Sequence, residues 1–292
     1  MDGESTLINP QGQNLINHGS ASLVAGLNLT LYKDKTGFIN NVTVGGLIDT
    51  DWSGSFAGYW GSAGSSANGA LFETVYAVSQ SVTFGQYWTL SNTYFNVVSN
   101  DVQAFGKAPG LTNFSGYPAL VWDEVKLALN DSFTGWPITF NPYVTWYYEL
   151  QSITIPGVSA ACFPCTVNNY DFFVGMTPTV NLEKYWGIPV TLKAPTYVTV
   201  GPSSFWNGGF GGSSGSVGMF TTGLTAVMPL SWMPAQYGHW YAKAGFQWYD
   251  IINTSLQNAN AFSVTGNLTC AATSAGNCSS IFVGFGGIGV AF

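Results

Sequence analysis

The strongest constraint on the fold is an alternation of apolar and polar residues with a period of two. It is clearest from His239 to Asp250, where one set of alternate positions is apolar and the other is more polar. The apolar set is Trp240, Ala242, Ala244, Phe246 and Trp248, and the other set is Tyr241, Lys243, Gly245, Gln247 and Tyr249. Successive side chains of a β-strand point to opposite faces, so this stretch predicts a strand with one apolar face.

The same period recurs at residues 138–150, 172–183 and 220–230. Short connections alternate along the chain with long ones that are rich in Gly, Ser and Asn. The short ones are Asp34–Gly37, Gln80–Gly85, Asn130–Gly135, Lys184–Ile188 and Ser231–Gly238, and the long ones are 51–69, 100–117, 151–170, 201–216 and 253–279. Short turns at one side and long loops at the other are typical of an up-and-down barrel.

Charge narrows the fold class further, because only 7% of the residues are charged, against about a quarter in soluble domains. A soluble all-β protein, such as a capsid or lectin sandwich, shares the alternation, but a water-facing surface with so little charge would be prone to association. The chain has no arginine, and its lysines are scattered, which speaks against nucleic acid as a partner. Because it also lacks a run of about 18 apolar residues, membrane-spanning helices are excluded.

We therefore expect an all-β fold, a single transmembrane antiparallel up-and-down β-barrel of about 12 strands with short periplasmic turns and long external loops. Strands are expected near residues 20–33, 38–50, 70–79, 86–98, 118–130, 136–150, 170–183, 188–200, 217–230, 239–252 and 279–292. A twelfth strand from Thr6 to Asn17, or a split strand elsewhere, would make the number even. Residues 1–19 are then an N-terminal segment with the first strand, and residues 20–292 are the barrel.

Proline is the main objection to these strands, because it removes a hydrogen bond from a sheet. Pro189 and Pro229 lie near expected turns, where proline is tolerated. The other three, Pro142, Pro178 and Pro195, need bulges or positions at the rim of the barrel.

The last expected strand, Ile281–Phe292, ends on an aromatic residue, with Ile288 and Val290 on the same face. It resembles the C-terminal strand of bacterial outer-membrane proteins. Residues 188–253, which include IPVTLKAPTYVTVG and PLSWMPAQYGHWYAKAGFQWYDIIN, look like uncharacterised porin-like barrels of Gram-negative bacteria. The resemblance implies an outer-membrane location, passive transport of small solutes, and the lipid bilayer and the barrel-assembly machinery as partners.

Membrane insertion leads to two further expectations. We expect three aromatic residues at the membrane interface, namely Trp240, Trp248 and Phe292. Residues 1–17 are polar and have neither the basic nor the apolar region of a signal peptide. Because the rest of the composition suits export, we interpret the sequence as a mature chain.

Charged side chains on the strands are expected to face the interior, since a lysine at the lipid midplane would cost about 2–4 kcal/mol. The expected pore-lining residues are Glu73, Glu124, Lys126, Glu149, Glu183, Lys193 and Lys243. Two interpretations stay open: these groups pair with one another and fill the lumen, or they line a pore for small neutral or mildly cationic solutes. The second predicts a porin-like channel, and its alternative is a plugged or structural barrel whose loops mediate surface interactions or lattice contacts.

The four cysteines form two local pairs in expected external loops, Cys162 with Cys165 and Cys270 with Cys278. We expect each pair to form a disulfide within its own loop, because disulfides persist in oxidising compartments. The CxxC spacing of the first pair also fits a redox or metal motif. Free thiols and pairing between the loops are the remaining alternatives.

Nothing in the sequence favours an enzyme, a metal site or a cofactor. Two histidines, His18 and His239, are too few for a histidine-rich metal site and leave little for acid-base catalysis. The GxSxG match around Ser213 lies in a Gly- and Ser-rich stretch without the strand-to-helix turn that such a motif needs. A hydrolase is therefore a minor alternative. The subunit number stays open, and a homo-oligomer is compatible with the sequence.

Overall fold

The structure is a computed structural model, and it describes residues 2–4, 7–8, 14–16, 20–53, 70–99, 118–151, 170–206, 215–257, 270–272 and 278–292. Most of these residues are in β-strands, which confirms the all-β class expected from the alternation. Within these ranges, no helix is both long enough and apolar enough to span a bilayer.

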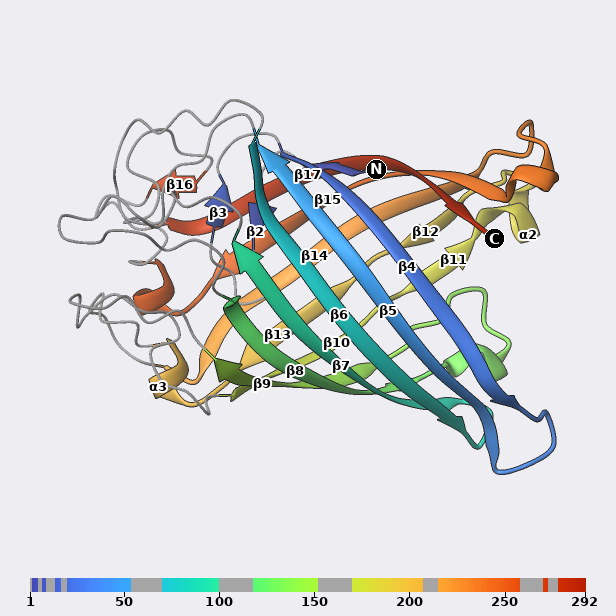
Figure 1. The fold of residues 1–292 in the computed structure, drawn as a ribbon, viewed down its shortest axis with the longest axis horizontal. Helices are drawn as coiled ribbons and strands as arrows, with labels where there is room; N and C mark the ends of the chain where they lie inside the picture. The colour runs from blue at the N-terminus through green and yellow to red at the C-terminus, as the bar shows by residue number, and fades with distance from the viewer. Residues whose placement is uncertain are drawn as a thin grey trace.

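One antiparallel sheet contains 15 strands in the described ranges. Its long strands follow one another as a meander, each beside the next (Figure 1). They are β4 (Ser20–Lys33), β5 (Ile39–Ser53), β6 (Ala70–Phe84), β7 (Trp88–Ser99), β8 (Pro118–Leu129), β9 (Tyr143–Gln151), β10 (Tyr170–Met176), β13 (Thr196–Val200), β14 (Val217–Pro229), β15 (His239–Ile251) and β17 (Cys278–Ala291). The short ones are β1 (Asp2–Glu4), β11 (Thr179–Asn181), β12 (Thr191–Lys193) and β16 (Cys270–Ala272).

Helical turns are short and lie between strands. They are η1 (Asp131–Thr134), α2 (Leu182–Trp186), α3 (Ser203–Trp206), η2 (Ala235–Tyr237) and a single turn at residues 254–257. All but α3 and residues 254–257 belong to the short connections, which lie together at one end of the sheet (Figure 1). The expected order of short and long connections is therefore confirmed. The second short turn is residues 85–87 and not Gln80–Gly85, because β6 continues to Phe84.

The N-terminal segment differs from the expectation. No strand from Thr6 to Asn17 joins the large sheet, because β2 (Leu7–Ile8) and β3 (Asn14–Ile16) pair with each other in a separate two-stranded sheet. Pro10 and Gly12 lie between them in the sequence and interrupt the strand pattern. In the large sheet, the place between β17 and β4 is taken by β1, which pairs with both.

The three prolines that were expected to disturb the strands do interrupt them. Pro178 separates β10 from β11, Pro195 separates β12 from β13, and Pro142 directly precedes β9. Their carbonyl groups still accept hydrogen bonds from the neighbouring strand. These bonds are Leu129 N–H to Pro142 O at 2.9 Å, Ala194 N–H to Pro178 O at 2.8 Å and Gly223 N–H to Pro195 O at 3.1 Å. Strand pairing therefore continues past each proline.

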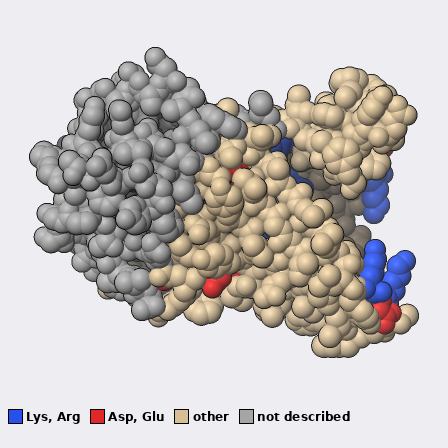
Figure 2. Space-filling view, viewed as in Figure 1, with Lys and Arg blue, Asp and Glu red and all other residues tan. Residues whose placement is uncertain are grey.

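Exposure follows the two-residue period. On β9, Val144 and Trp146 are exposed while Thr145 and Tyr147 are buried. On β10, Phe172 and Val174 are exposed on the same side of the sheet, opposite the buried Asp171 and Phe173. One face of the sheet is thus an apolar outer wall, and the other is an inner wall. Figure 2 shows that the outer wall on this side of the molecule carries few charged side chains.

Charged side chains gather instead at the short-turn end (Figure 2). The turn after β4 is an example: Asp34 Oδ1 accepts hydrogen bonds from the backbone N–H and the hydroxyl of Thr36, both at 2.8 Å. These bonds, with the backbone bond as the largest cause, hold the pKa of the Asp34 carboxyl below its ordinary value. The turn therefore presents a stable negative charge beside Lys33 and Lys35.

A second carboxylate fastens the turn after β8. Asp131 is buried, and its two oxygens accept the backbone N–H groups of Phe140 at 2.8 Å and Asn141 at 3.0 Å. Asn141 has a positive φ of 47°, a conformation that asparagine tolerates better than most residues. The carboxylate thus holds a strained segment at the start of β9.

Replacement of the Asp131 carboxylate should lower the stability of the protein measurably. Asp131→Ala leaves two N–H groups without their acceptor and should lower the free energy of unfolding by about 1.5–3 kcal/mol, as expected for hydrogen bonds to a charged group. The exposed neighbour Ser132 provides the control, since Ser132→Ala should change the free energy of unfolding by less than about 0.5 kcal/mol. Denaturant titration of both variants measures the difference. Equal losses would contradict this role of Asp131.

Candidate functional site

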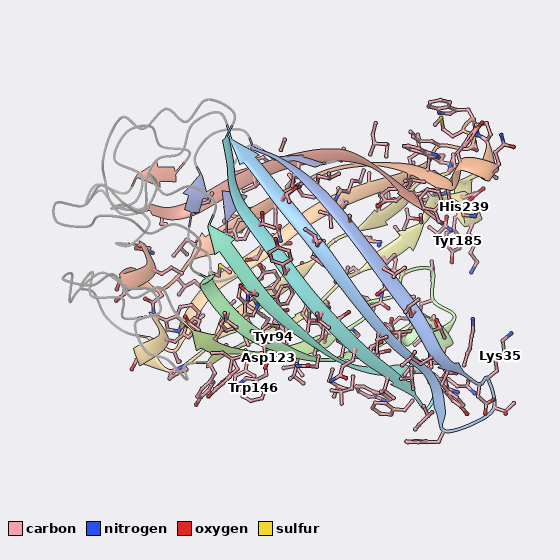
Figure 3. All side chains as sticks on the ribbon, in the orientation of Figure 1. Lys35, Tyr94, Asp123, Trp146, Tyr185 and His239 are labelled. Atoms are coloured by element: carbon pink, nitrogen blue, oxygen red, sulfur yellow. The ribbon has the colours of Figure 1, made fainter. Side chains whose placement is uncertain are left out.

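Exposed aromatic side chains mark the short-turn end of the sheet. They come from the turns between successive strands and from the C-terminus, and they include Phe38, Phe133, Trp136, Trp186, Trp232 and Phe292. Figure 3 shows Tyr185 and His239 at the same end. Aromatic girdles of this kind flank the apolar band of outer-membrane barrels. We call these six residues the turn aromatics.

Of the three expected interface residues, only Phe292 belongs to the turn aromatics. Trp240 is half-buried near that end and donates a hydrogen bond from Nε1 to Tyr237 O at 3.0 Å. Trp248 lies further along β15 on the outer wall, with its ring centroid 6.3 Å from that of Phe220. The other turn aromatics were missed in the sequence analysis, although an aromatic in or beside each expected short turn was a usable signal.

Three carboxylates gather on the inner wall near the long-loop end. Glu124 of β8 lies opposite Tyr147 of β9, which lies opposite Asp171 of β10. Glu149 is two residues beyond Tyr147 on the same face. We call Glu124, Glu149 and Asp171 the acidic group.

The carboxylates of the acidic group accept few hydrogen bonds from the described residues. Glu149 and Asp171 are 0% exposed, and their carboxylate oxygens accept no hydrogen bond from the described residues. The Tyr147 hydroxyl between them is likewise buried without a partner there. Glu124 accepts one bond, from Trp122 Nε1 at 3.0 Å. A buried charge without a partner is costly, so these acids must hold protons or receive a cation.

Of the expected lysines, Lys126 lies two residues from Glu124 on the same face of β8. It extends its Nζ over the ring of Tyr143, 4.1 Å from the centroid. Lys193 and Lys243 line a cavity of 490 Å³, whose other lining residues are Thr177, Pro195, Thr225, Val227 and Tyr241. This lysine cavity is formed by β12, β14 and β15 nearer the short-turn end. On the inner wall, Glu149 and Asp171 therefore lie near the long-loop end, and Lys193 and Lys243 lie nearer the short-turn end.

Two of the seven expected pore-lining residues are not part of these groups. Glu183 lies in α2 at the short-turn end, where it is exposed and its N–H donates to Asn181 Oδ1 at 2.9 Å. Glu73 belongs to β6, but its side chain lies outside the described part of the protein.

Several strand acids were not among the expected residues, including Asp171 and Asp123. Asp171 shares the inner face with Phe173 and Gly175, so the alternation itself was the signal for it. Asp123 breaks the rule that strand charges face inward, because it lies on the outer wall opposite Tyr94 and Tyr148 (Figure 3). Its two tyrosine neighbours supply a partly polar surrounding.

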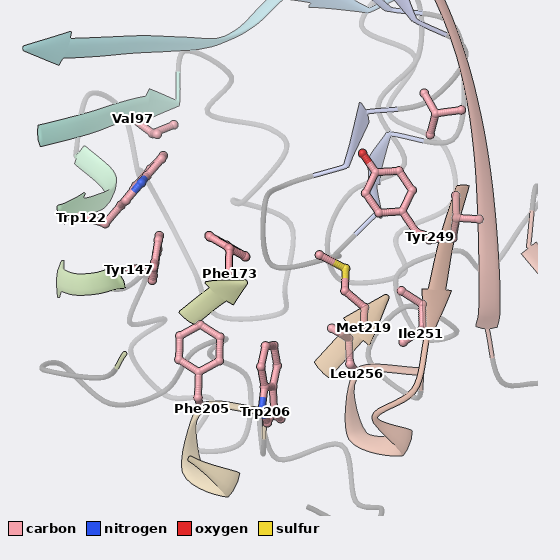
Figure 4. Packing of buried hydrophobic residues seen from close by; sticks show 12 residues of the cluster. Val97, Trp122, Tyr147, Phe173, Phe205, Trp206, Met219, Tyr249, Ile251 and Leu256 are labelled. Atoms are coloured by element: carbon pink, nitrogen blue, oxygen red, sulfur yellow. The ribbon is translucent and has the colours of Figure 1, made fainter. Parts of the chain in front are cut away.

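A group of residues from the connections at the long-loop end packs against the inner wall (Figure 4). Phe205 and Trp206 of α3 and Leu256 are each 0% exposed. The Phe205 ring centroid lies 6.0 Å from that of Tyr147, and the Trp206 ring packs on Gly218 of β14, where a Cβ would overlap it. We call these three residues the loop plug. They belong to one cluster with Val97 of β7 and Ile281 of β17, so the sheet curves around them.

No cluster of His, Cys, Asp and Glu that could hold a metal ion occurs in the described ranges. Cys162, Cys165 and Ser213 lie outside these ranges. Cys270 and Cys278 belong to the paired strands β16 and β17, with Ala272 opposite Cys278, but their side chains are not described. Both disulfides therefore stay predictions.

Comparison of the chain with protein-family models, with curated proteins and with solved structures finds no match.

The packing of the loop plug predicts a large effect of Trp206. Trp206→Ala removes a fully buried ring and should lower the free energy of unfolding by about 3–5 kcal/mol. Trp232 is 75% exposed, so Trp232→Ala is the matched control and should cost less than about 1 kcal/mol. Denaturant titration followed by circular dichroism measures both. A loss for Trp206→Ala as small as that of the control would show that α3 does not pack inside.

Proposed function

We propose that this chain is a β-barrel of a bacterial outer membrane that lets small solutes diffuse through it. The observation that carries the proposal is the outer wall, which is apolar at most of the alternate strand positions and is bordered by the turn aromatics. In water, such an apolar surface would cause the protein to associate. In a bilayer it is the surface that a strand needs, with the aromatics at the headgroup level.

Strand pairing supports a barrel as well. β1 connects the two ends of the meander, since it pairs with β17 and with β4. Antiparallel strands span a membrane only as a closed barrel, because an open edge leaves backbone groups unsatisfied in lipid. The proposal therefore includes closure between β17 and β4.

The acidic group suggests the preference of the channel. Glu124 is the member of the group that is partly exposed on the inner wall, and the net charge of the whole chain is −7. Carboxylates on the wall of a pore attract cations and repel anions. We propose small neutral or mildly cationic solutes as the ones that pass. Lys193 and Lys243 of the lysine cavity then place positive charge nearer the periplasmic turns.

The loop plug favours a second candidate function. Phe205, Trp206 and Leu256 are fully buried against the inner wall at the long-loop end, where they would obstruct a solute. In that case the barrel is plugged, and its long loops mediate surface contacts with other molecules. The two candidates differ in one property, which is whether the barrel conducts ions.

Conductance in a planar bilayer separates the two candidates. The channel predicts reproducible open steps and a reversal potential of the cation-selective sign in a KCl gradient. Because Glu124 is the partly exposed member of the acidic group, Glu124→Gln should move the reversal potential toward zero. Glu183→Gln is the control, since Glu183 is exposed in α2 away from the acidic group, and it should leave the reversal potential unchanged. Absence of open steps at every voltage would contradict the channel and support the plugged barrel.

A further inference from the structure

The lysine cavity is lined by two positive side chains and, among the described residues that line it, by no negative one. These two are Lys193 and Lys243, and the volume of the cavity is 490 Å³. The whole chain has 14 acidic and 7 basic residues, so a cavity lined by chance would be expected to hold more acids than lysines. Two like charges around one cavity repel each other, and an anion between them removes that repulsion.

The two lysines reach the cavity from opposite sides of β14. Lys193 of β12 lies opposite Thr225. Lys243 of β15 lies opposite Val227, two residues further along β14. Two strand spacings and two residues of rise separate the Cα atoms of the lysines by about 12 Å. Because lysine carries its ammonium group on a long, flexible stem, both groups can contact one small ligand from its two sides.

The space beside the lysines is open on the inner face of the sheet. Lys193 shares that face with Thr225 and Gly245, yet its side chain is exposed, because it borders the cavity. On β17, Gly287 lies opposite Lys243 and adds no side chain to the space there.

A second glycine of β17 positions the tyrosine of the cavity. Gly289 lies opposite Tyr241, and a Cβ at Gly289 would overlap the Tyr241 ring. Glycine at this position therefore lets the ring lie across β17 at the edge of the cavity. The ring and its hydroxyl group are thus held where a ligand of the two lysines would contact them.

The remaining lining residues fit an organic anion. Thr177, Thr225 and Tyr241 carry hydroxyl groups, which donate hydrogen bonds to anionic oxygens. Pro195, Val227 and the Tyr241 ring provide apolar surface. Lysine binds phosphate as a point charge, and 490 Å³ lies within the range of about 300–1,000 Å³ for small-molecule sites. A bare phosphate ion would leave most of this volume unfilled.

We propose that the lysine cavity binds a small organic phosphate, a monoester whose dianionic head lies between Lys193 and Lys243. The body of the ligand then contacts Pro195, Val227 and the ring of Tyr241. The inference goes beyond the proposed function, because a ligand that binds nearer the short-turn end does not have to pass the acidic group. Binding also needs no open channel, so binding and conductance are separate measurements.

NMR of methylated lysines tests the site on the full chain in detergent micelles. Reductive methylation with isotope-labelled formaldehyde keeps the positive charge, and the chain has only seven lysines to label besides its N-terminus. Lys→Arg variants assign the signals, since arginine is not methylated. Titration with glycerol phosphate at constant ionic strength should shift the Lys193 and Lys243 signals along one saturation curve. Lys184 is exposed in α2, and its signal should move little.

Removal of one charge distinguishes a shared ligand from two independently bound ions. Lys193→Gln should raise the dissociation constant measured at the Lys243 signal about tenfold, as expected for the loss of a charged hydrogen-bond donor. The matched control is Lys184→Gln, which removes the same charge from an exposed position and should change that constant by less than about twofold. The signals of the other lysines show whether each variant still folds.

Other outcomes overturn the proposal. Equal shifts of all the lysine signals, or the same shifts with added sodium chloride alone, mean charge screening without a site. A Lys193 signal that moves while the Lys243 signal stays fixed means that the two lysines share no ligand. Tighter binding of inorganic phosphate than of glycerol phosphate contradicts an organic ligand. A chain that conducts but binds neither compound overturns this site alone, whereas binding without conductance supports the site and contradicts the channel.

Discussion

The rest of the structure depends on the fact that a β-strand turns successive side chains to opposite faces. This chain has 14 acidic and 7 basic residues, too few to cover a large surface. On the long strands, the alternation collects apolar side chains on the outer wall and leaves the inner wall to polar, small and charged ones. The antiparallel meander then places equivalent positions of adjacent strands side by side. The two walls are thus a direct consequence of a local rule.

The charge and the packing of the inner-wall side chains change from one end of the sheet to the other. At the long-loop end, the acidic group lies among the rings of Trp122, Tyr147 and Phe205, which exclude water. Nearer the short turns, the lysine cavity offers 490 Å³ of open space. Glu149 and Asp171 therefore lie near one end of the inner wall, and Lys193 and Lys243 lie nearer the other. The loop plug lies next to the acids, so any movement of α3 would change both the width of the path and the exposure of Glu149 and Asp171.

Much of the fold was predictable from the sequence because it depends on local patterns. The strands 20–33 and 239–252 were expected within a residue of β4 and β15, since both have a regular period and clear turn residues. The prolines at 178 and 195 were correctly expected to disturb their strands, because the missing N–H acts locally. The N-terminal strand was misplaced, since its position depends on pairing with β17, almost the whole chain away.

The candidate site was only partly predictable for the same reason. Alternation assigned Glu124, Glu149 and Lys243 to the inner face, and it would have assigned Asp171 had that residue been included. It could not show that α3 turns Phe205 and Trp206 inward, because a loop has no period that fixes its direction. Nor could it show that Glu183 would lie in a helical turn away from the wall, since α2 interrupts the strand pattern directly after Asn181.

If lipid covers the outer wall, spin labels placed one at a time along β15 in a reconstituted bilayer should have high oxygen accessibility at Ala242, Ala244 and Phe246. At Lys243, Gly245 and Gln247 the oxygen accessibility should be low, so the profile alternates with a period of two. A profile without this period, or equal access of a water-soluble nickel complex to both sets of positions, would contradict the membrane barrel.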